Sequence, residues 1–155
     1  MAKATVAKLR IESGIIDGPL AAALLTPAPL VSPHDGGIAS FIGVVRDHHL
    51  GLGVRSLRYE CYEAMAAPML RHIVERVAAA LPSDDGEATS LVVRLFHGVG
   101  EMVPGDVSLV VQVSSAHRVA AFGACRAIVE AIKADLPVWK EERYDDGSAC
   151  FLKGS

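Results

Sequence analysis

Two lysines near the end of the chain have a setting that could support chemistry. They stand in IKADLPVWKEE, where Lys133 precedes Lys140 by seven residues and Lys140 directly follows Trp139, the only tryptophan. We expect the apolar ring of Trp139 to be packed, and an apolar wall beside an ammonium group favours the neutral amine that acid–base catalysis uses. Simpler interpretations stay open: Lys133 complements the dipole of a helix C-terminus, and Lys140 is a solvated charge.

A second polar group, Arg46-Asp47-His48-His49, follows the apolar run IASFIGVV. Functional side chains often stand on loops that leave a rigid scaffold, so this segment is a candidate binding site, with a solvated turn as the alternative. Adjacent histidines also raise the question of a metal site. Neighbours on an extended chain point apart, however, and no carboxylate or cysteine ligand pattern accompanies them, so the sequence favours a site without metal.

The third group, Ser114-Ser115-Ala116-His117-Arg118, stands where a strand pattern changes to a helix pattern. Ser115 is the predicted N-cap, and the free N–H groups and positive dipole end of a helix start favour an anion. His117 and Arg118 in the first turn add positive charge, which is unfavourable for an isolated helix. A bound phosphate would explain that pattern, whereas side chains that only cover neighbouring loops are the alternative.

Hydrophobic periodicity and turn residues indicate the elements that must position these groups. Strand patterns cover residues 5–12, 38–46, 54–62, 89–100 and 107–115, and two short strands flank a turn within 138–153. A short helix capped by Asp17 is expected to run to residue 25. Longer helices are predicted over residues 64–81 and from Ser115 to Pro137, which prevents the last helix from continuing. Loops and turns are expected at residues 26–37, 47–53, 82–88 and 103–106.

The order of these elements predicts an α+β fold with a mostly antiparallel sheet. A chain of 155 residues, 51% hydrophobic and 21% charged, is long enough to bury a real core and has a globular composition. No repeat, low-complexity tract or internal linker divides it. We therefore expect a single domain over residues 1–155.

Composition also limits the function classes. The net charge of −3 argues against a general nucleic-acid binder. The three cysteines, Cys61, Cys125 and Cys150, have no C-x-x-C spacing, which is typical of reduced thiols, and we expect all three to be buried structural residues. The N-terminal residues contain no signal-peptide apolar region, and no apolar run approaches the ~20 residues that cross a bilayer. These features predict a cytoplasmic protein that does not bind membranes.

Five stretches in one order resemble a known family. They are FIGVVRDHHLG (41–51), LRYECYEAM (57–65), GEMVPGD (100–106), SSAHRVAAF (114–122) and IKADLPVWKEE (132–142). Together they resemble the catalytic, or large, subunit of molybdopterin synthase, the MoaE family. The matching region covers about residues 37–143, and the combination of motifs in this order is highly specific.

The resemblance implies a fold, a reaction and partners. The fold would be an α/β hammerhead with additional antiparallel sheet. The reaction would insert two sulfurs into cyclic pyranopterin monophosphate to form the dithiolene of molybdopterin, as a step of molybdenum cofactor biosynthesis. Sulfur would arrive as a thiocarboxylate on the C-terminal glycine of a small ubiquitin-like subunit, with no metal or redox cofactor required. Two large subunits would form the central homodimer of a heterotetramer.

The resemblance also assigns roles to residues by position. Lys133 and Lys140 match the family's active-site lysines, the first near the partner's terminal carbonyl and the second as an acid or base on the pterin. The matches to the substrate pocket are Phe41, Arg46, His117, Arg118 and Glu142. Cationic groups suit the phosphate and the carboxy-terminal tail. Family members commonly carry a longer basic tail than this chain's FLKGS, and Lys153 is the candidate replacement.

Two other functions are compatible with parts of the sequence. A non-catalytic module could capture the tail of a ubiquitin-like partner without transferring sulfur, although such a module has less need of two lysines. A phosphate-ester hydrolase could use His48, His49 and His117 on a metal ion.

Overall fold

The computed structural model of the chain describes residues 8–82 and 89–154. Its eight strands form one sheet in the order β2-β6-β5-β4-β7-β8, with β1 beside β5 and β3 beside β4. The strands are β1 (Lys8–Asp17), β2 (Gly37–Val44), β3 (His48–His49), β4 (Leu52–Cys61), β5 (Ser90–Met102), β6 (Val107–Ser115), β7 (Val138–Tyr144) and β8 (Ala149–Lys153). The helices are α1 (Glu63–Ala80) and α2 (Arg118–Asp135), with 3-10 turns η1 (Ala22–Leu24) and η2 (Ala28–Leu30).

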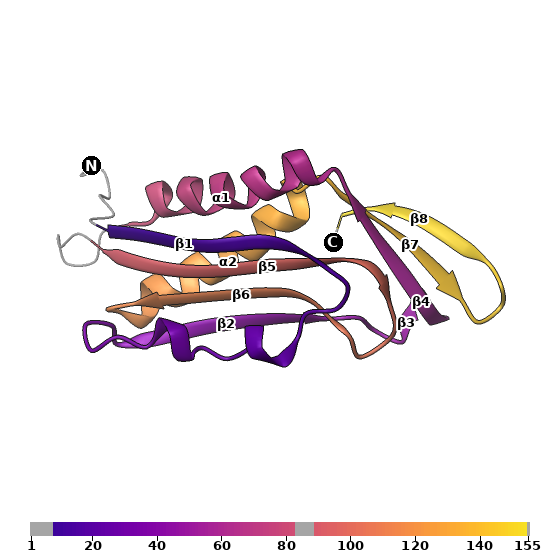
Figure 1. Ribbon diagram of the computed structural model, residues 1–155, viewed down its shortest axis with the longest axis horizontal. Helices are drawn as coiled ribbons and strands as arrows, with labels where there is room; N and C mark the ends of the chain where they lie inside the picture. Colours follow the sequence, from indigo (N-terminus) through magenta and orange to yellow (C-terminus); the bar gives the residue numbers. More distant parts are fainter. Residues whose placement is uncertain (1–7, 83–88, 155) are drawn as a thin grey trace.

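The sheet has two parts that meet at a corner. Strands β1, β5, β6 and β2 form the main sheet, and strands β3, β4, β7 and β8 form an arm that extends beyond it (Figure 1). Among the described strands, the end of β5 joins the two parts, because Leu57 to Tyr59 of β4 pair with Gly100 to Met102 of β5. The long strand β5 therefore carries the backbone hydrogen bonding from the main sheet into the arm.

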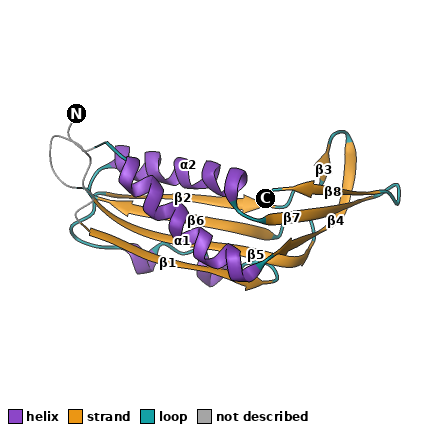
Figure 2. Cartoon of the chain, turned by 90° about the horizontal axis from the view of Figure 1, so that it is seen from above, coloured by secondary structure: helices purple, strands orange, loops and turns teal. Residues whose placement is uncertain are grey.

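Both helices cover one face of the main sheet (Figure 2). Each helix has small and branched apolar residues at helical spacing, and these positions are the buried ones, such as Leu70 and Ile73 in α1 and Ile128 and Ile132 in α2. They meet the inward side chains of β5 and β6 in the main core. The end of α2 is thereby fixed above the corner between the main sheet and the arm.

The other face of the main sheet is covered by the segment that contains the two 3-10 turns. Leu20 packs there with Phe96 and Val110. Two buried polar side chains hold this segment: Arg94 donates to the carbonyl of Thr26, and Gln112 donates to the carbonyl of Leu25. These bonds satisfy polar groups that burial would otherwise destabilise.

The structure confirms the predicted α+β class and the mostly antiparallel sheet. Every strand pair is antiparallel except β1 with β5. Helix α2 ends at Asp135, just before Pro137, and two strands flank the turn at residues 145–147, both as predicted. The expected strand start at residues 5–7 and the expected turn at residues 83–88 lie outside the described residues. In the part of the chain that is described, no helix is long and apolar enough to cross a membrane.

Three local predictions were wrong. Ser115 is the last residue of β6, paired with both Gly37 and Leu91, and the N-cap of α2 is His117. Strand pairing on both sides outweighs the capping preference of a serine. Asp17 ends β1 instead of capping a helix, and the 3-10 turn η1 lies where the helix to residue 25 was expected. The expected loop at residues 47–53 contains the two-residue strand β3.

Candidate active site

A cavity of about 400 Å³ lies at the corner between the main sheet and the arm. Five of the seven predicted site residues line it: Phe41, Arg46, Lys133, Lys140 and Glu142. They come from β2, the segment after it, the end of α2, and β7. The corner therefore gathers side chains that are up to about a hundred residues apart in the sequence.

The alternation of β7 aims its functional side chains into the cavity. Lys140, Glu142 and Tyr144 share one face of the strand, while Trp139 and Glu141 lie on the other. Pairing with β4 places Lys140 opposite Tyr59, which also lines the cavity. The position of Lys140 thus depends on the pairing of β7 with β4.

Glu142 is the most buried ionisable group of the site, with 4% of its surface exposed. Its Oε1 lies 3.2 Å from Nζ of Lys140. Its Oε2 accepts hydrogen bonds from Nδ1 of His49, at 2.6 Å, and from the hydroxyl of Tyr144, at 2.8 Å. The carboxylate therefore has partners on both oxygens, as a buried charge requires.

These contacts determine the ionisation of the cluster. Burial by itself would raise the pKa of Glu142, but the hydrogen bonds from Tyr144, His49 and Lys140 and the charge of Lys140 together lower it. Burial and the bond to Glu142 raise the pKa of Tyr144 to about 12. Near neutral pH the carboxyl is thus an anion that accepts, and the phenol is a neutral donor.

The two free cations of the cavity come from different elements. Arg46 is exposed on the segment after β2, and Lys133 is exposed on the last turn of α2. Within residues 8–82 and 89–154, neither forms an ion pair with a carboxylate. With Lys140 and Glu142, the cavity holds three cationic side chains against one carboxylate, an arrangement that attracts anions.

His117 and Arg118 do not line this cavity. They begin α2 at the opposite end of the β2–β6 pair, where Gly37 faces Ser115, while Gly43 faces Leu109 beside the cavity. Six residues of strand separate these ends by roughly 20 Å at about 3.3 Å per residue. Within one chain, the seven predicted residues therefore form two groups.

Trp139 does not provide the expected apolar wall. It lies on the face of β7 opposite Lys140 and is 38% exposed. The immediate neighbour of Lys140 is instead the charged Glu142, so the environment of this lysine is polar.

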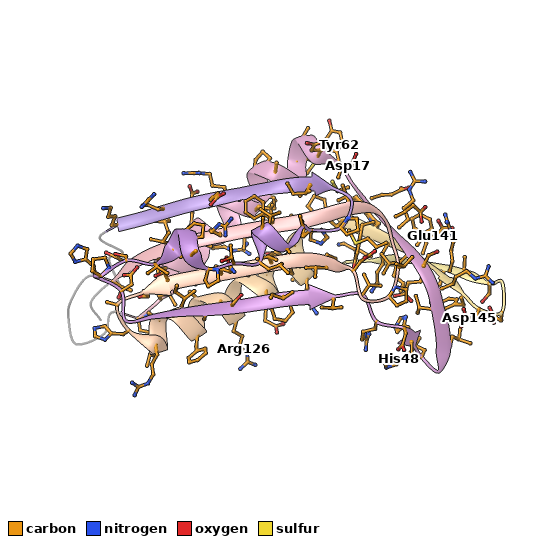
Figure 3. All side chains as sticks on the ribbon, turned by 60° about the horizontal axis from the view of Figure 1, so that its bottom comes forward. Asp17, His48, Tyr62, Arg126, Glu141 and Asp145 are labelled. Atoms are coloured by element: carbon orange, nitrogen blue, oxygen red, sulfur yellow. The ribbon has the colours of Figure 1, made fainter. Side chains whose placement is uncertain are left out.

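The three histidines considered for a metal site do not converge. Nδ1 of His48 bonds to its neighbour Asp47, and Nδ1 of His49 bonds to Glu142. His48 lies at the arm end of the molecule, on the same side as Asp145 (Figure 3), whereas His117 begins α2. Among the described residues, no group of three histidine, cysteine, aspartate or glutamate side chains could hold a metal ion.

The expectation for the cysteines was only partly correct. All three are free, and burial raises the pKa of the Cys125 thiol, which donates to the carbonyl of Val111. Cys61 is partly buried, however, and Cys150 is exposed. Lys153, the suggested replacement for a basic tail, is exposed on β8 and does not line the cavity.

Sequence reasoning missed three residues behind the site. His49 was considered as part of a candidate binding segment and as a metal ligand but not as a partner of Glu142, and Tyr144 was not considered. His97, fully buried in β5, packs its ring edge-on against Tyr59 and donates from Nδ1 to the carbonyl of Gly98. Its position inside an apolar strand was the one available signal, since a histidine there needs a polar partner.

Comparisons with known proteins identify the family. The family model described as MoaE protein matches residues 17–135. A molybdopterin synthase catalytic subunit of Culex quinquefasciatus is 38% identical over 116 residues, which cover 74% of this chain and 69% of the relative. The molybdopterin synthase catalytic subunit 1 of Mycobacterium tuberculosis is 36% identical over 121 residues, 78% of each chain.

Solved structures share the fold. The molybdopterin synthase of Staphylococcus aureus superimposes with a TM-score of 0.73 at 28% identity, covering 90% of this chain and 95% of that one. A complex of subunits 1 and 2 of molybdopterin-converting factor from Helicobacter pylori has a TM-score of 0.71 at 19% identity, covering 91% and 90%. These similarities confirm the predicted family fold. From the family model and the relatives, we conclude that the chain belongs to the MoaE protein family.

Proposed function

We propose that this chain is the catalytic subunit of a molybdopterin synthase, transferring sulfur from the C-terminal thiocarboxylate of a small ubiquitin-like subunit to cyclic pyranopterin monophosphate. The observation that carries the proposal is the cavity, which is lined by three cationic side chains, Lys133, Lys140 and Arg46, and by the carboxylate of Glu142. Both proposed reactants are anionic, one through its phosphate and the other through its terminal thiocarboxylate. A cationic cavity suits both.

The chemistry assigns each lysine a distinct task. Each sulfur that bonds to a pterin carbon displaces an oxygen substituent from that carbon, which leaves as water or as the phosphate ester oxygen. Water then cleaves the acyl carbon–sulfur bond, so that the partner leaves as a carboxylate. Lys133, which has no carboxylate partner among the described residues, stabilises the oxyanion that develops on the acyl group. Lys140, held by Glu142, exchanges protons with the pterin. Arg46 binds the phosphate, and Phe41 forms an apolar wall of the cavity.

A two-fold dimer would bring the two groups of predicted residues together. Strand β2 is an edge of the sheet, and Ile42 and Val44 on it are 41% and 51% exposed. Phe122, on the neighbouring surface of α2, is 67% exposed. A two-fold axis near the middle of β2 exchanges the ends of the strand between copies. We propose that His117 and Arg118 of one copy thereby approach the cavity of the other and bind substrate there.

The complete assembly in this proposal is a heterotetramer, with a small subunit bound at each end of the central dimer. The Helicobacter protein of the same fold is a complex with a second subunit, and we extend a two-subunit assembly to this chain as part of the proposal. Free cysteines are typical of a reducing compartment, which supports a cytoplasmic location.

The test is reconstitution of the reaction. The chain is mixed with the thiocarboxylated small subunit and cyclic pyranopterin monophosphate, and the dithiolene product is assayed. A partner that ends in an ordinary carboxylate is the matched control and should give no product. Tail binding without product from the thiocarboxylated partner would contradict the proposal and favour the non-catalytic binding module.

A further inference from the structure

The side chain of His49 contacts the candidate site through Glu142. It stands on β3, whose two residues pair with Leu52 and Gly53 of β4 in a tight hairpin. The turn between the strands uses positive φ angles at Leu50 and Gly51. Such a short, closed hairpin gives the His49 ring a defined direction toward β7.

The two oxygens of Glu142 have different partners. Oε2 accepts from both His49, at 2.6 Å, and Tyr144, at 2.8 Å, while Oε1 faces Nζ of Lys140 at 3.2 Å. Two donors on one oxygen prevent the carboxylate from rotating. The other oxygen is thereby kept toward the lysine.

We propose that His49 is a positioning residue of the site, which donates its Nδ1 proton to Oε2 of Glu142 so that Oε1 holds the Lys140 ammonium in the cavity. This inference rests on the proposed function. It adds that the position of the catalytic Lys140 on β7 depends on His49, a residue of the β3–β4 hairpin. The side chains of His49 and Glu142 are 23% and 6% exposed, so the bond is largely shielded from competing water.

The same hairpin segment also carries residues that line the cavity. Arg46 and His48 precede His49 by three residues and one residue. The bond from His49 to Glu142 therefore fixes this segment against β7, 93 residues away in the chain. Loss of the bond releases one wall of the cavity as well as the carboxylate.

Substitutions of His49 test the donor directly. In His49→Ala the donor is absent, and we expect the turnover number for dithiolene formation to fall by about 10- to 100-fold, the usual effect of losing a hydrogen bond to a charged group. His49→Asn places a neutral N–H near the position of Nδ1 and should recover activity to within about threefold of wild type. The Michaelis constant for the thiocarboxylated partner should change less than the turnover number. His72→Asn, on the exposed face of α1, is the matched control.

A second measurement does not depend on activity or on the stability of a variant. In wild-type protein, nitrogen chemical shifts of the His49 ring should show a proton on Nδ1 at neutral pH, because Glu142 is the acceptor there. An unprotonated Nδ1, full activity in His49→Ala, or equal loss in His49→Asn and His49→Ala would each overturn the inference. If wild-type protein forms no dithiolene, the proposed function fails, while the nitrogen shifts still report on the His49–Glu142 bond.

Discussion

The two ends of the β2–β6 pair differ in the contacts that one chain provides to the candidate site residues there. At the arm end, Lys140 and Glu142 lie in a cavity with bonded neighbours and restricted exposure. At the other end, His117 and Arg118 begin a helix, and His117 makes no side-chain capping bond. Lys140 and Glu142 are thus held by contacts within the chain, whereas among the described residues Arg118 has no ion pair and His117 makes no capping bond.

Removing Lys140 should have the largest effect. Lys140→Ala deletes the proposed acid–base group, and we expect dithiolene formation to slow by about 10²- to 10⁴-fold. Binding of the thiocarboxylated partner should be retained, because Lys133 and Arg46 are unchanged. Lys8→Ala, an exposed lysine of β1, is the control. Full sulfur transfer by Lys140→Ala would contradict the proposed role of Lys140 as an acid or base.

His117 and Arg118, at the start of α2, offer a test of whether two chains contribute to one site. Arg118→Ala should weaken binding of cyclic pyranopterin monophosphate by about 10- to 100-fold, since a charge-assisted bond is lost. Arg71→Ala on α1 is the matched control. An unchanged dissociation constant in Arg118→Ala would show that this end does not bind substrate.

Mixed dimers of Lys140→Ala and Arg118→Ala chains test directly whether Lys140 and Arg118 of one site come from different copies. If each site uses Lys140 of one copy and Arg118 of the other, a random mixture should recover about one quarter of wild-type activity, the share of sites that are intact. If one chain supplies both residues, every site in the mixture stays defective. Native mass spectrometry before the assay checks that the chains have exchanged, because the two substitutions change the mass of the chain by different amounts.

His97 gives a smaller effect that concerns the support of the arm end. Burial lowers the pKa of His97, and its bond to Gly98 only partly opposes this. As pH falls, His97 therefore takes up a proton in the unfolded chain at a higher pH than in the folded chain. The free energy of unfolding should consequently fall as pH drops below about 6.5. The loss is at most about 1.4 kcal/mol per pH unit. His97→Leu should flatten this slope in urea titrations, whereas His72→Leu, at an exposed position, should leave it unchanged.

Removing the Tyr144 hydroxyl should have the smallest effect. Tyr144→Phe keeps the ring but removes one of the two donors to Oε2 of Glu142 found among the described residues, so that His49 remains. We expect a loss of about 1 kcal/mol in the free energy of unfolding, measured by urea titration, and a decrease of a few-fold in activity. An effect as large as that of Lys140→Ala would mean that the phenol itself takes part in the reaction.

Much of the arm end could be predicted because its signals are local. Pro137 marked the end of α2, the DDG turn marked the last hairpin, and the family motifs named both lysines. The contact between His49 and Glu142 could not be predicted, because it joins residues 93 positions apart and depends on the pairing of β4 with both β3 and β7. No pattern in either segment indicates the other.

At the start of α2, a local sequence signal was present but was overridden by strand pairing. Ser115 has the residue type of an N-cap, yet partners on two neighbouring strands keep it in β6. The packing of Trp139 was mispredicted for a similar reason, since the face of a strand on which a residue lies is set by pairing and not by its own hydrophobicity. Separation of His117 from the cavity follows from the length of β2 and β6. Local patterns predicted the bounds of β6 and, to within two residues, those of β2, but not the pairing of the two strands.

The alternation of β7 also limits how this chain can change by insertion and deletion. A single residue added between Pro137 and Trp139 would shift the strand by one position and turn Trp139 and Glu141 toward the cavity, in place of Lys140 and Glu142. Composition and net charge would hardly change, yet the lysine and its carboxylate would face solvent. The turn at residues 145–147, beyond the last cavity-facing side chain, is where this part of the chain can accept extra residues without such a loss.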